Sequence, residues 1–353
     1  MTKPVLCFVG TGGMGQQAHL ANYAQLRDAG KCEIAGVVDL QRDLAEAVAA
    51  KYGVPQVYAD LDTALADSRV TGVVCVQQWP NNYPLVKHIL LAGKSVLTEK
   101  PMVGRLEEVE ELVALAAERG VLYAVGFMKR YDPGVELAKR LVDQALVSEE
   151  LGPLRSVDAW CNGGDWRQNV GAPIRAPSST PLPSLVPTYP ETCRTPRQRE
   201  AYGYLLNIFS HNVNLCHHLL GTELEPRAAA FHGSTAMLVT ARCGNALVSI
   251  RGASSAAHEW RERTTLTFAG GEIVIRSATP MNRQQVAEVA VLRQDDGAFR
   301  TTVHHAPIAW AFYRQAEGFV QALAGEATLR APAEQCLRDV RVMQRIIELA
   351  DVQ

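Results

Sequence analysis

Short apolar runs alternate with helical patterns along the first 126 residues. Five runs rich in β-branched residues are typical of buried parallel strands: residues 5–9, 34–39, 73–77, 95–97 and 122–126. The segments between them have the apolar spacing of amphipathic helices: residues 15–28, 44–52, 61–66, 83–92 and 106–119. Strands that alternate with helices form βαβ units, so the pattern predicts an α/β fold with a doubly wound parallel sheet.

The pattern changes after residue 126. A helix at 133–146 and a strand at 154–161 precede a long irregular stretch, and a helical pattern follows at 204–220. Extended runs joined by glycine-containing turns come next: residues 236–241, 246–251, 264–268, 272–276 and 286–292. They predict an open, mostly antiparallel sheet with a helix on its face, and helical patterns at 310–324 and 333–352 follow. We therefore expect two domains, residues 1–126 and 127–353.

Composition narrows the class of protein. The 353 residues are 47% hydrophobic and 20% charged, which is typical of a soluble globular protein. Lys and Arg number 35 against 37 Asp and Glu, and this balance argues against a nucleic-acid or anionic-membrane binder. No apolar run approaches the ~18–20 residues that span a bilayer. The eight cysteines form no CxxC pair, so we expect reduced core thiols in a cytoplasmic protein, and we expect this protein to be an enzyme.

A glycine loop, Gly10-Thr-Gly12-Gly13-Met14-Gly15, connects the first predicted strand to the first helix. In a dinucleotide-binding loop the first glycine permits a tight turn, the second lets the backbone approach a pyrophosphate, and the third allows close helix packing. Asp39 ends the second strand, where a carboxylate accepts hydrogen bonds from ribose hydroxyls and repels a 2′-phosphate. We therefore expect NAD rather than NADP, although Arg42 lies nearby and Asp39 could instead cap the next helix.

Two further strand ends carry polar residues. Gln77, Trp79 and Asn81 lie at the end of the 73–77 strand, at the edge of a parallel sheet where a dinucleotide binds. Glu99, Lys100 and Pro101 follow the 95–97 strand, and the Lys100–Pro101 bond is a candidate for the cis isomer. We expect the cofactor site to be lined by Gln77, Trp79, Asn81, Glu99 and Lys100. The alternative is a surface lysine followed by an ordinary loop.

These motifs together resemble the Gfo/Idh/MocA oxidoreductases, which include inositol dehydrogenases and glucose–fructose oxidoreductase. The resemblance rests on the glycine loop, Glu99-Lys100-Pro101, the sequence GFMKRYDP at 126–133 and the pair Asn207-xxx-His211. It covers nearly the whole chain, and the 126–133 motif is closest to the inositol dehydrogenases. It implies an N-terminal Rossmann domain and a C-terminal α/β domain with an open antiparallel sheet.

The resemblance also implies catalytic residues. The family carries a Lys and an Asp-xxx-His pair, which match Lys100 and His211, whereas Asn207 replaces the Asp. Oxidation of an alcohol requires a proton acceptor, for which a neutral imidazole is suited, and a cation can stabilise the developing alkoxide. Asn207 lies four residues before His211, on the same helical face, and can orient the ring or bind a substrate hydroxyl. A purely structural histidine bonded to Asn207 is the alternative.

Other residues are expected near the substrate. Lys129 and Tyr131 follow from the 126–133 motif, and the irregular stretch 161–203 contains Asp165 and Trp166. Loops of this length are often lids or binding loops. An aromatic face suits a sugar ring, and a carboxylate suits an ammonium group. The same stretch could instead be a subunit-contact arm, and both roles are compatible.

The leading hypothesis is an NAD-dependent dehydrogenase that oxidises a ring hydroxyl of a sugar, glycoside, aminoglycoside or cyclitol to a ketone. A redox-neutral NAD-dependent glycosidase and a non-catalytic NAD-binding sensor are the alternatives. We expect a homo-oligomer, a dimer or tetramer formed through the C-terminal sheet, and neither a nucleic-acid nor a membrane partner. No metal site is expected, because the paired histidines at 217–218 and 304–305 lack partners at ligand spacing.

Overall fold

The computed structural model describes residues 3–168, 170–175, 182, 184–256 and 259–353. Parts of the irregular stretch 161–203, namely residues 169, 176–181 and 183, lie outside this description. The chain divides into two compact units, each built from three segments. The first contains Met1–Phe127, Gly171–Thr188 and Phe312–Leu337, and the second contains Met128–Val170, Tyr189–Ala311 and Arg338–Gln353.

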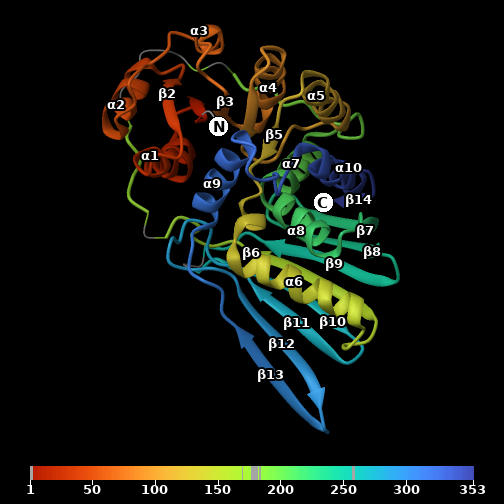
Figure 1. Cartoon of the computed structure of the whole chain (residues 1–353). Helices are drawn as coiled ribbons and strands as arrows, with labels where there is room; N and C mark the ends of the chain where they lie inside the picture. The colour runs from red at the N-terminus through yellow and green to blue at the C-terminus, as the bar shows by residue number, and fades with distance from the viewer. Residues whose placement is uncertain (1–2, 169, 176–181, 183, 257–258) are drawn as a thin grey trace. The chain divides into compact units, whose positions relative to one another are not determined.

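The first unit is built on a five-stranded parallel sheet with the strand order β2-β1-β3-β4-β5 (Figure 1). Its strands are β1 (Val5–Val9), β2 (Glu33–Val38), β3 (Gly72–Cys75), β4 (Ser95–Thr98) and β5 (Tyr123–Val125). Its helices are the π-helical turn η1 (Gly15–Leu20), α1 (Ala21–Asp28), α2 (Arg42–Tyr52), α3 (Leu61–Ala66), the 3₁₀ turn η2 (Trp79–Asn81), α4 (Asn82–Leu91) and α5 (Leu106–Arg119). The predicted doubly wound parallel sheet is confirmed.

A later helix, α9 (Ala311–Leu323), contributes to the core of this unit. Phe319 and Val320 are buried with the β1 residues Leu6 and Phe8. A Cβ at Gly72 would lie 2.8 Å from a methyl group of Leu323, so the absence of a side chain there lets α9 pack closely.

The second unit contains a nine-stranded sheet with the order β13-β12-β11-β10-β6-β9-β8-β7-β14. Its strands are β6 (Leu154–Asn162), β7 (Glu225–His232), β8 (Ala236–Cys243), β9 (Ala246–Ala253), β10 (Arg261–Phe268), β11 (Gly271–Arg276), β12 (Glu288–Asp295), β13 (Ala298–His304) and β14 (Ala350–Val352). Its helices are the 3₁₀ turn η3 (Met128–Tyr131), α6 (Pro133–Ser148), α7 (Pro196–Tyr204), the π-helical turn η4 (Leu205–Phe209) and α8 (Ser210–Leu220). One more helix, α10 (Ala333–Glu348), begins in the first unit and continues in the second.

Helices cover one face of this sheet, as the sequence predicted. Figure 1 shows α6 lying across the strands, and it contacts β11 and β12. Strand β8 alternates accordingly, because Met237 and Val239 are buried whereas Leu238 is 45% exposed. The other face of these strands is open within the unit, which is typical of an antiparallel sheet with one solvated side.

The open, mostly antiparallel sheet is confirmed, with two parallel pairs in it, β6 with β9 and β14 with β7. Two other expectations about the second part of the chain were wrong. The final helix ends at Glu348 and the chain then adds β14, since three residues gain backbone partners on β7. The stretch 161–203 is not wholly irregular, because α7 begins at Pro196 behind a capping box formed by Thr195 and Gln198.

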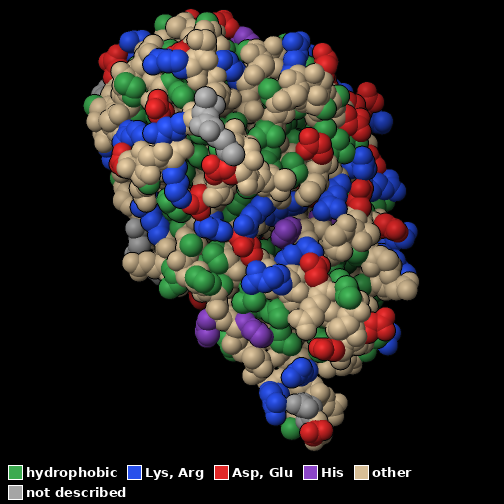
Figure 2. Space-filling model, in the orientation of Figure 1, with side chains coloured by type: hydrophobic (Ala, Val, Ile, Leu, Met, Phe, Trp, Pro, Cys, Tyr) green, Lys and Arg blue, Asp and Glu red, His purple; other side chains and the backbone are tan. Residues whose placement is uncertain are grey.

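None of the helices in the described part of the chain combines the length and the apolar composition needed to cross a membrane. On the face drawn in Figure 2, cationic and anionic side chains occur side by side over most of the surface. This mixture agrees with the formal net charge of -2.

Candidate active site

The glycine loop runs from the end of β1 into η1, and its glycines have different surroundings. Gly10 has a φ of +97°, and a Cβ there would lie 2.3 Å from the carbonyl oxygen of Val76. A Cβ at Gly15 would lie 2.3 Å from the carbonyl oxygen of Gly10. A Cβ at Gly12 would meet nothing within 4 Å, and Gly12 is exposed, with Gly13 and Met14 partly exposed beside it. This open backbone at a helix start fits the pyrophosphate of a dinucleotide.

Asp39 holds the glycine loop in place. One carboxylate oxygen accepts from the backbone N–H of Thr11 at 2.7 Å and from its hydroxyl at 2.8 Å. The other accepts from the N–H of Gln41 at 2.9 Å. A carboxylate has about four acceptor positions, so the half-buried Asp39 retains capacity for a ribose hydroxyl.

The turn after β3 lies beside the same loop. A Cβ at Gly10 would be 2.5 Å from the side-chain nitrogen of Gln77, so this amide packs directly against the first glycine. Trp79 lies in η2, and its ring packs on Gly104, where a Cβ would be 2.6 Å away. Asn81 is half-buried and precedes α4. Because β1, β3 and β4 are neighbouring parallel strands, the segments that follow them meet at one edge of the sheet.

Lys100 follows β4 at this edge and is half-buried, and the Lys100–Pro101 bond is cis, as predicted. Glu99, predicted as a cofactor residue, is engaged by protein groups through both oxygens. Its Oε1 lies 2.7 Å from Nε2 of the buried His19, and its Oε2 accepts from the N–H of Lys100 at 3.1 Å. Gly126 packs closely against the same side chain, because a Cβ there would lie 3.2 Å from Oε2 of Glu99.

Two supporting residues in this region were missed by the sequence reasoning. His19 lies on η1, 80 residues before Glu99, and nothing in the sequence pairs them. Asn82 is fully buried and donates to the carbonyl oxygens of Pro101 at 3.1 Å and Met102 at 2.9 Å. Its position at the start of a predicted helix was a signal only for capping. Both residues fix the backbone on either side of Lys100.

In the second unit, Asn207 and His211 lie where a π-helical turn becomes a regular helix. Asn207 is in η4 and exposed, and His211 is in the first turn of α8 and half-buried. The other π-helical turn, η1, lies in the first unit at the glycine loop. Insertions of this kind in helices occur frequently at functional sites.

A buried polar chain fixes α8. Arg130 Nε donates to Asn214 Oδ1 at 2.9 Å, and Asn214 Nδ2 donates to Asp339 at 2.5 Å. His217 Nδ1 lies 2.5 Å from the same carboxylate, and its Nε2 accepts from the N–H of Leu224 at 3.1 Å. Since a backbone N–H can only donate, Nε2 carries no proton and Nδ1–H donates to Asp339. These bonds orient the helix that carries His211.

Lys129 and Tyr131, predicted near the substrate, are both buried in η3. Lys129 is 7% exposed, and its ammonium group pairs with the carboxylate of Glu262 on β10. Asn212 and Trp260 each donate to Glu262 at 3.3 Å. The structure thus provides Lys129 with a protein partner that the sequence did not indicate.

Asp165 and Trp166 lie in an exposed turn of the second unit after β6. Asp165 accepts from the N–H of Arg167 at 2.9 Å, and the Arg167 guanidinium lies 5.5 Å from the centre of the Trp166 ring. These contacts are local to the turn.

Most of the thiols lie in the interior of the two units. All eight cysteines are free, and seven are buried. Burial raises the pKa of Cys7, Cys75 and Cys216 to about 12, which keeps these thiols protonated. Among the described residues, no three His, Cys, Asp or Glu side chains are grouped so as to hold a metal ion.

The first unit matches a known protein family. Residues 6–127 match a family described as "Oxidoreductase family, NAD-binding Rossmann fold", the Gfo/Idh/MocA family. The chain is 35% identical over 117 residues to trans-1,2-dihydrobenzene-1,2-diol dehydrogenase of Mus musculus, covering 33% of each chain. It is 30% identical over 183 residues to D-xylose dehydrogenase of Paenarthrobacter nicotinovorans, covering 47% of this chain and 46% of the relative. The match to inositol 2-dehydrogenase 3 of Saccharopolyspora erythraea is 32% over 144 residues, covering 40% and 41%. The chain thus spans less than half the length of these curated relatives.

Solved structures resemble the chain over its whole length. KijD10, a 3-ketoreductase from Actinomadura kijaniata solved with NADP and TDP-benzene, gives a TM-score of 0.76 over 99% of this chain and 98% of its own, at 18% identity. The UDP-N-acetylglucosamine 3-dehydrogenase GnnA from Acidithiobacillus ferrooxidans gives 0.71 over 98% and 97%, also at 18% identity. This likeness shows a shared fold. Residues 6–127 thus match the Gfo/Idh/MocA oxidoreductase family, and the whole chain shares the fold of these solved structures.

Proposed function

We propose that the protein is a nicotinamide-dinucleotide oxidoreductase that oxidises a secondary ring hydroxyl of a sugar, glycoside, aminoglycoside or cyclitol to a ketone. One observation carries the proposal. The open backbone at Gly12, the Gln77–Trp79 turn and Lys100 follow three neighbouring parallel strands, so a dinucleotide on the glycine loop has a cation near its reactive end. The names of the relatives, which include sugar, cyclitol and dihydrodiol dehydrogenases, support this substrate class.

The proposed roles follow from the chemistry of each side chain. The bound dinucleotide supplies the hydride acceptor. Lys100 binds the substrate oxygen and stabilises its developing negative charge, and His211 takes the hydroxyl proton. Asn207, one turn before His211, orients the ring or binds a neighbouring hydroxyl as an amide can, without the charge that a carboxylate would add. Tyr131, Lys129, Asp165 and Trp166 remain proposed substrate residues, and the pairing with Glu262 favours a supporting role for Lys129.

We propose NAD rather than NADP as the preferred cofactor. The support is the Asp39 carboxylate at the end of β2, which would repel a 2′-phosphate. KijD10 was solved with NADP, so the comparison with that protein does not favour NAD. Titration with NADH and with NADPH tests this choice directly. Equal or tighter binding of NADPH would contradict the role assigned to Asp39.

We also propose a homo-oligomer in the cytoplasm, a dimer or tetramer formed through the nine-stranded sheet. Its support is the open sheet face, where Leu238 is 45% exposed and Leu247 is 59% exposed. Arg242, which pairs across the strands with Leu247, lies on the same face. Sedimentation velocity of the purified protein measures the number of subunits.

A substrate panel tests the proposed reaction. Purified protein is incubated with NAD against inositols, pyranosides and aminoglycosides, and NADH absorbance and substrate loss are followed together. NADH that forms in step with a ketone supports the dehydrogenase. Substrate loss without net NADH would instead indicate a redox-neutral glycosidase, and dinucleotide binding without any turnover would indicate a sensor.

A further inference from the structure

Part of the long stretch after β6 packs on the first unit, although β6 and α7 on either side of it belong to the second. We call its described residues, 171–175, 182 and 184–188, the docked segment. Each end contacts a different loop of the first unit. Both loops belong to the proposed dinucleotide site, so this inference rests on the proposed function.

The first end is joined to the glycine loop by one side-chain amide. The N–H of Ile174 donates to Oε1 of Gln16 at 2.8 Å, and Nε2 of Gln16 donates to the carbonyl oxygen of Ile174 at 3.1 Å. The same Nε2 donates to the carbonyl oxygen of Thr11 at 2.8 Å, and Gln16 is only 1% exposed. A single buried amide therefore connects the docked segment to the residue between Gly10 and Gly12.

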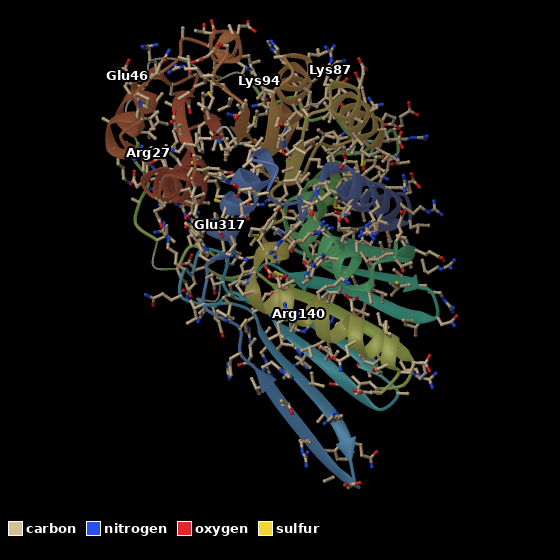
Figure 3. The ribbon with its side chains drawn as sticks, viewed as in Figure 1. Arg27, Glu46, Lys87, Lys94, Arg140 and Glu317 are labelled. Atoms are coloured by element: carbon tan, nitrogen blue, oxygen red, sulfur yellow. The ribbon has the colours of Figure 1, made fainter. Side chains whose placement is uncertain are left out.

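Neighbouring contacts reinforce this end. The side chain of Ile174 packs against the hydrophobic core of the first unit, and the carbonyl oxygen of Gly171 accepts from the Gln17 side chain. The Tyr52 hydroxyl donates to the carbonyl oxygen of Gln16 at 3.2 Å. Arg27, labelled in Figure 3, donates in turn to the carbonyl oxygen of Tyr52 at 2.7 Å. Gln16 is thus hydrogen-bonded to the docked segment through its side chain and to Tyr52 through its backbone carbonyl.

The second end meets the turn that carries Trp79. A Cβ at Gly104 would lie 2.1 Å from the carbonyl oxygen of Thr188 and 2.6 Å from the Trp79 ring, so Thr188 and Trp79 pack on the same glycine. The Thr188 hydroxyl donates to Glu108 at 3.0 Å. This end therefore lies at the turn after β3, while the first end lies at the loop after β1.

Ordering a long connection costs conformational entropy, so these contacts must offset that cost. Most of them converge on loops at the edge of the sheet where this fold binds its ligand. We propose that the docked segment is a dinucleotide-retention element: Ile174 and Thr188 are positioning residues that hold the glycine loop and the Trp79 turn in their binding conformation and slow release of the dinucleotide.

Dinucleotide dissociation tests the proposal without any knowledge of the substrate. NADH bound to the full-length protein is displaced with excess NAD in a stopped-flow fluorimeter, for wild type, Ile174→Ala, Thr188→Val and the double variant. Ile174→Ala removes the side chain that packs on the core and so loosens the backbone that bonds to Gln16, and Thr188→Val removes the hydroxyl that donates to Glu108. Val186→Ala is the matched control, because this neighbouring side chain is 77% exposed. We expect the dissociation rate constant to rise about five- to tenfold in each single variant, more in the double variant, and less than about twofold in the control.

If the docked segment only stabilised the fold, Ile174→Ala and Thr188→Val would lower the melting temperature of the ligand-free protein and leave the dissociation rate constant unchanged. Both quantities are therefore measured. Unchanged dissociation in Ile174→Ala and Thr188→Val would overturn the proposal. If Ile174→Ala does not fold, Thr188→Val decides alone, because it removes one hydrogen bond and keeps the side-chain shape. Wild-type protein that binds neither NADH nor NADPH would instead overturn the proposed function, and this inference with it.

Discussion

At the scale of single residues, the glycine loop separates two requirements that the sequence motif combines. Gly10 and Gly15 are required by the protein, because a Cβ at either position would overlap a carbonyl oxygen. A Cβ at Gly12 would meet nothing within 4 Å, so the fold itself does not require a glycine there. We propose that this glycine serves dinucleotide binding, whereas Gly10 and Gly15 serve packing.

Substitution by alanine should distinguish these glycines. Gly12→Ala should change the free energy of unfolding by less than about 0.5 kcal/mol and weaken NADH binding at least about tenfold. Gly15→Ala should cost about 1–3 kcal/mol of stability, because the helix start must shift away from Gly10. Chemical denaturation and fluorescence titration provide the two measurements. Loss of stability in Gly12→Ala with normal binding would contradict this assignment.

Substitution of Asn207 tests whether residue 207 affects the pKa of His211. A carboxylate one turn away stabilises the protonated imidazole and raises its pKa, whereas an amide does not. Asn207→Asp should therefore move the acid limb of the kcat profile to higher pH by about one unit. Asn207→Ser, which adds no charge, is the control for loss of the amide. An unmoved limb in Asn207→Asp would mean that Asn207 does not act on His211.

The sequence indicated candidate site residues that follow local patterns, and it missed supporting partners that come from distant parts of the chain. Gly12, Lys100 and His211 follow recognisable strand, turn or helix patterns. The pair His19 and Glu99 could not be predicted, because these residues come from different elements 80 positions apart. For the same reason the ion pair between Lys129 and Glu262 could not be predicted, because these residues are 133 positions apart.

At the scale of elements, the predicted bounds agree with the structure where the apolar pattern is clear. They are wrong where pairing with a distant strand decides the conformation. The strand β1 and the helix α5 have the predicted bounds, because the continuous apolar run of β1 and the amphipathic spacing of α5 are clear in the sequence. Strand β14 was missed because three residues cannot show a pattern, and only pairing with β7 makes them a strand. The helix α7 had a readable capping box at Thr195 and Gln198, so this omission was avoidable.

The ion pair between Lys129 and Glu262 joins η3 to β10 and provides a test at this scale. Lys129→Met should cost about 3–5 kcal/mol of unfolding free energy, because it leaves a buried carboxylate unpaired. Glu262→Gln keeps an acceptor for Asn212 and Trp260. The double variant should therefore lose at least about 1 kcal/mol less than the sum of the single variants. Additive costs in urea denaturation would show that the pair is not coupled.

At the scale of the whole molecule, the chain order does not follow the two units. Each unit is assembled from three segments, and the docked segment belongs to a unit other than that of its neighbours in sequence. A pattern of apolar residues indicates elements but not which of two cores a loop joins. The expected role of 161–203 at the substrate therefore remains a proposal, as does the role of 171–175 and 184–188 in retaining the dinucleotide.

Acid stability of the whole protein should depend on His218. Burial, followed by the charges of Arg130, Lys139 and Arg338, lowers the pKa of His218 to about 3. In the unfolded chain the imidazole binds a proton near pH 6.5, so its contribution to stability is present above that pH and is lost as pH falls toward 3. Between pH 7 and pH 4 this loss should be about 2 kcal/mol for the partly exposed ring.

His218→Gln removes this titration and serves as its own control at pH 8. The free energy of unfolding of wild type should fall more steeply with acid than that of the variant, as measured by urea denaturation at each pH. Parallel curves would contradict the assignment.

In the proposed reaction, Lys100 and His211 carry out an oxidation with a bound dinucleotide. The most direct measurement is the ketone formed per NADH, with the substrate that the panel identifies, for wild type, Lys100→Met and His211→Ala. We expect one ketone per NADH in wild type, a loss of turnover of at least about 10²-fold in both variants, and NADH binding within about threefold of wild type for His211→Ala. Full turnover in either variant, or ketone formation that does not match NADH, would contradict the proposed reaction.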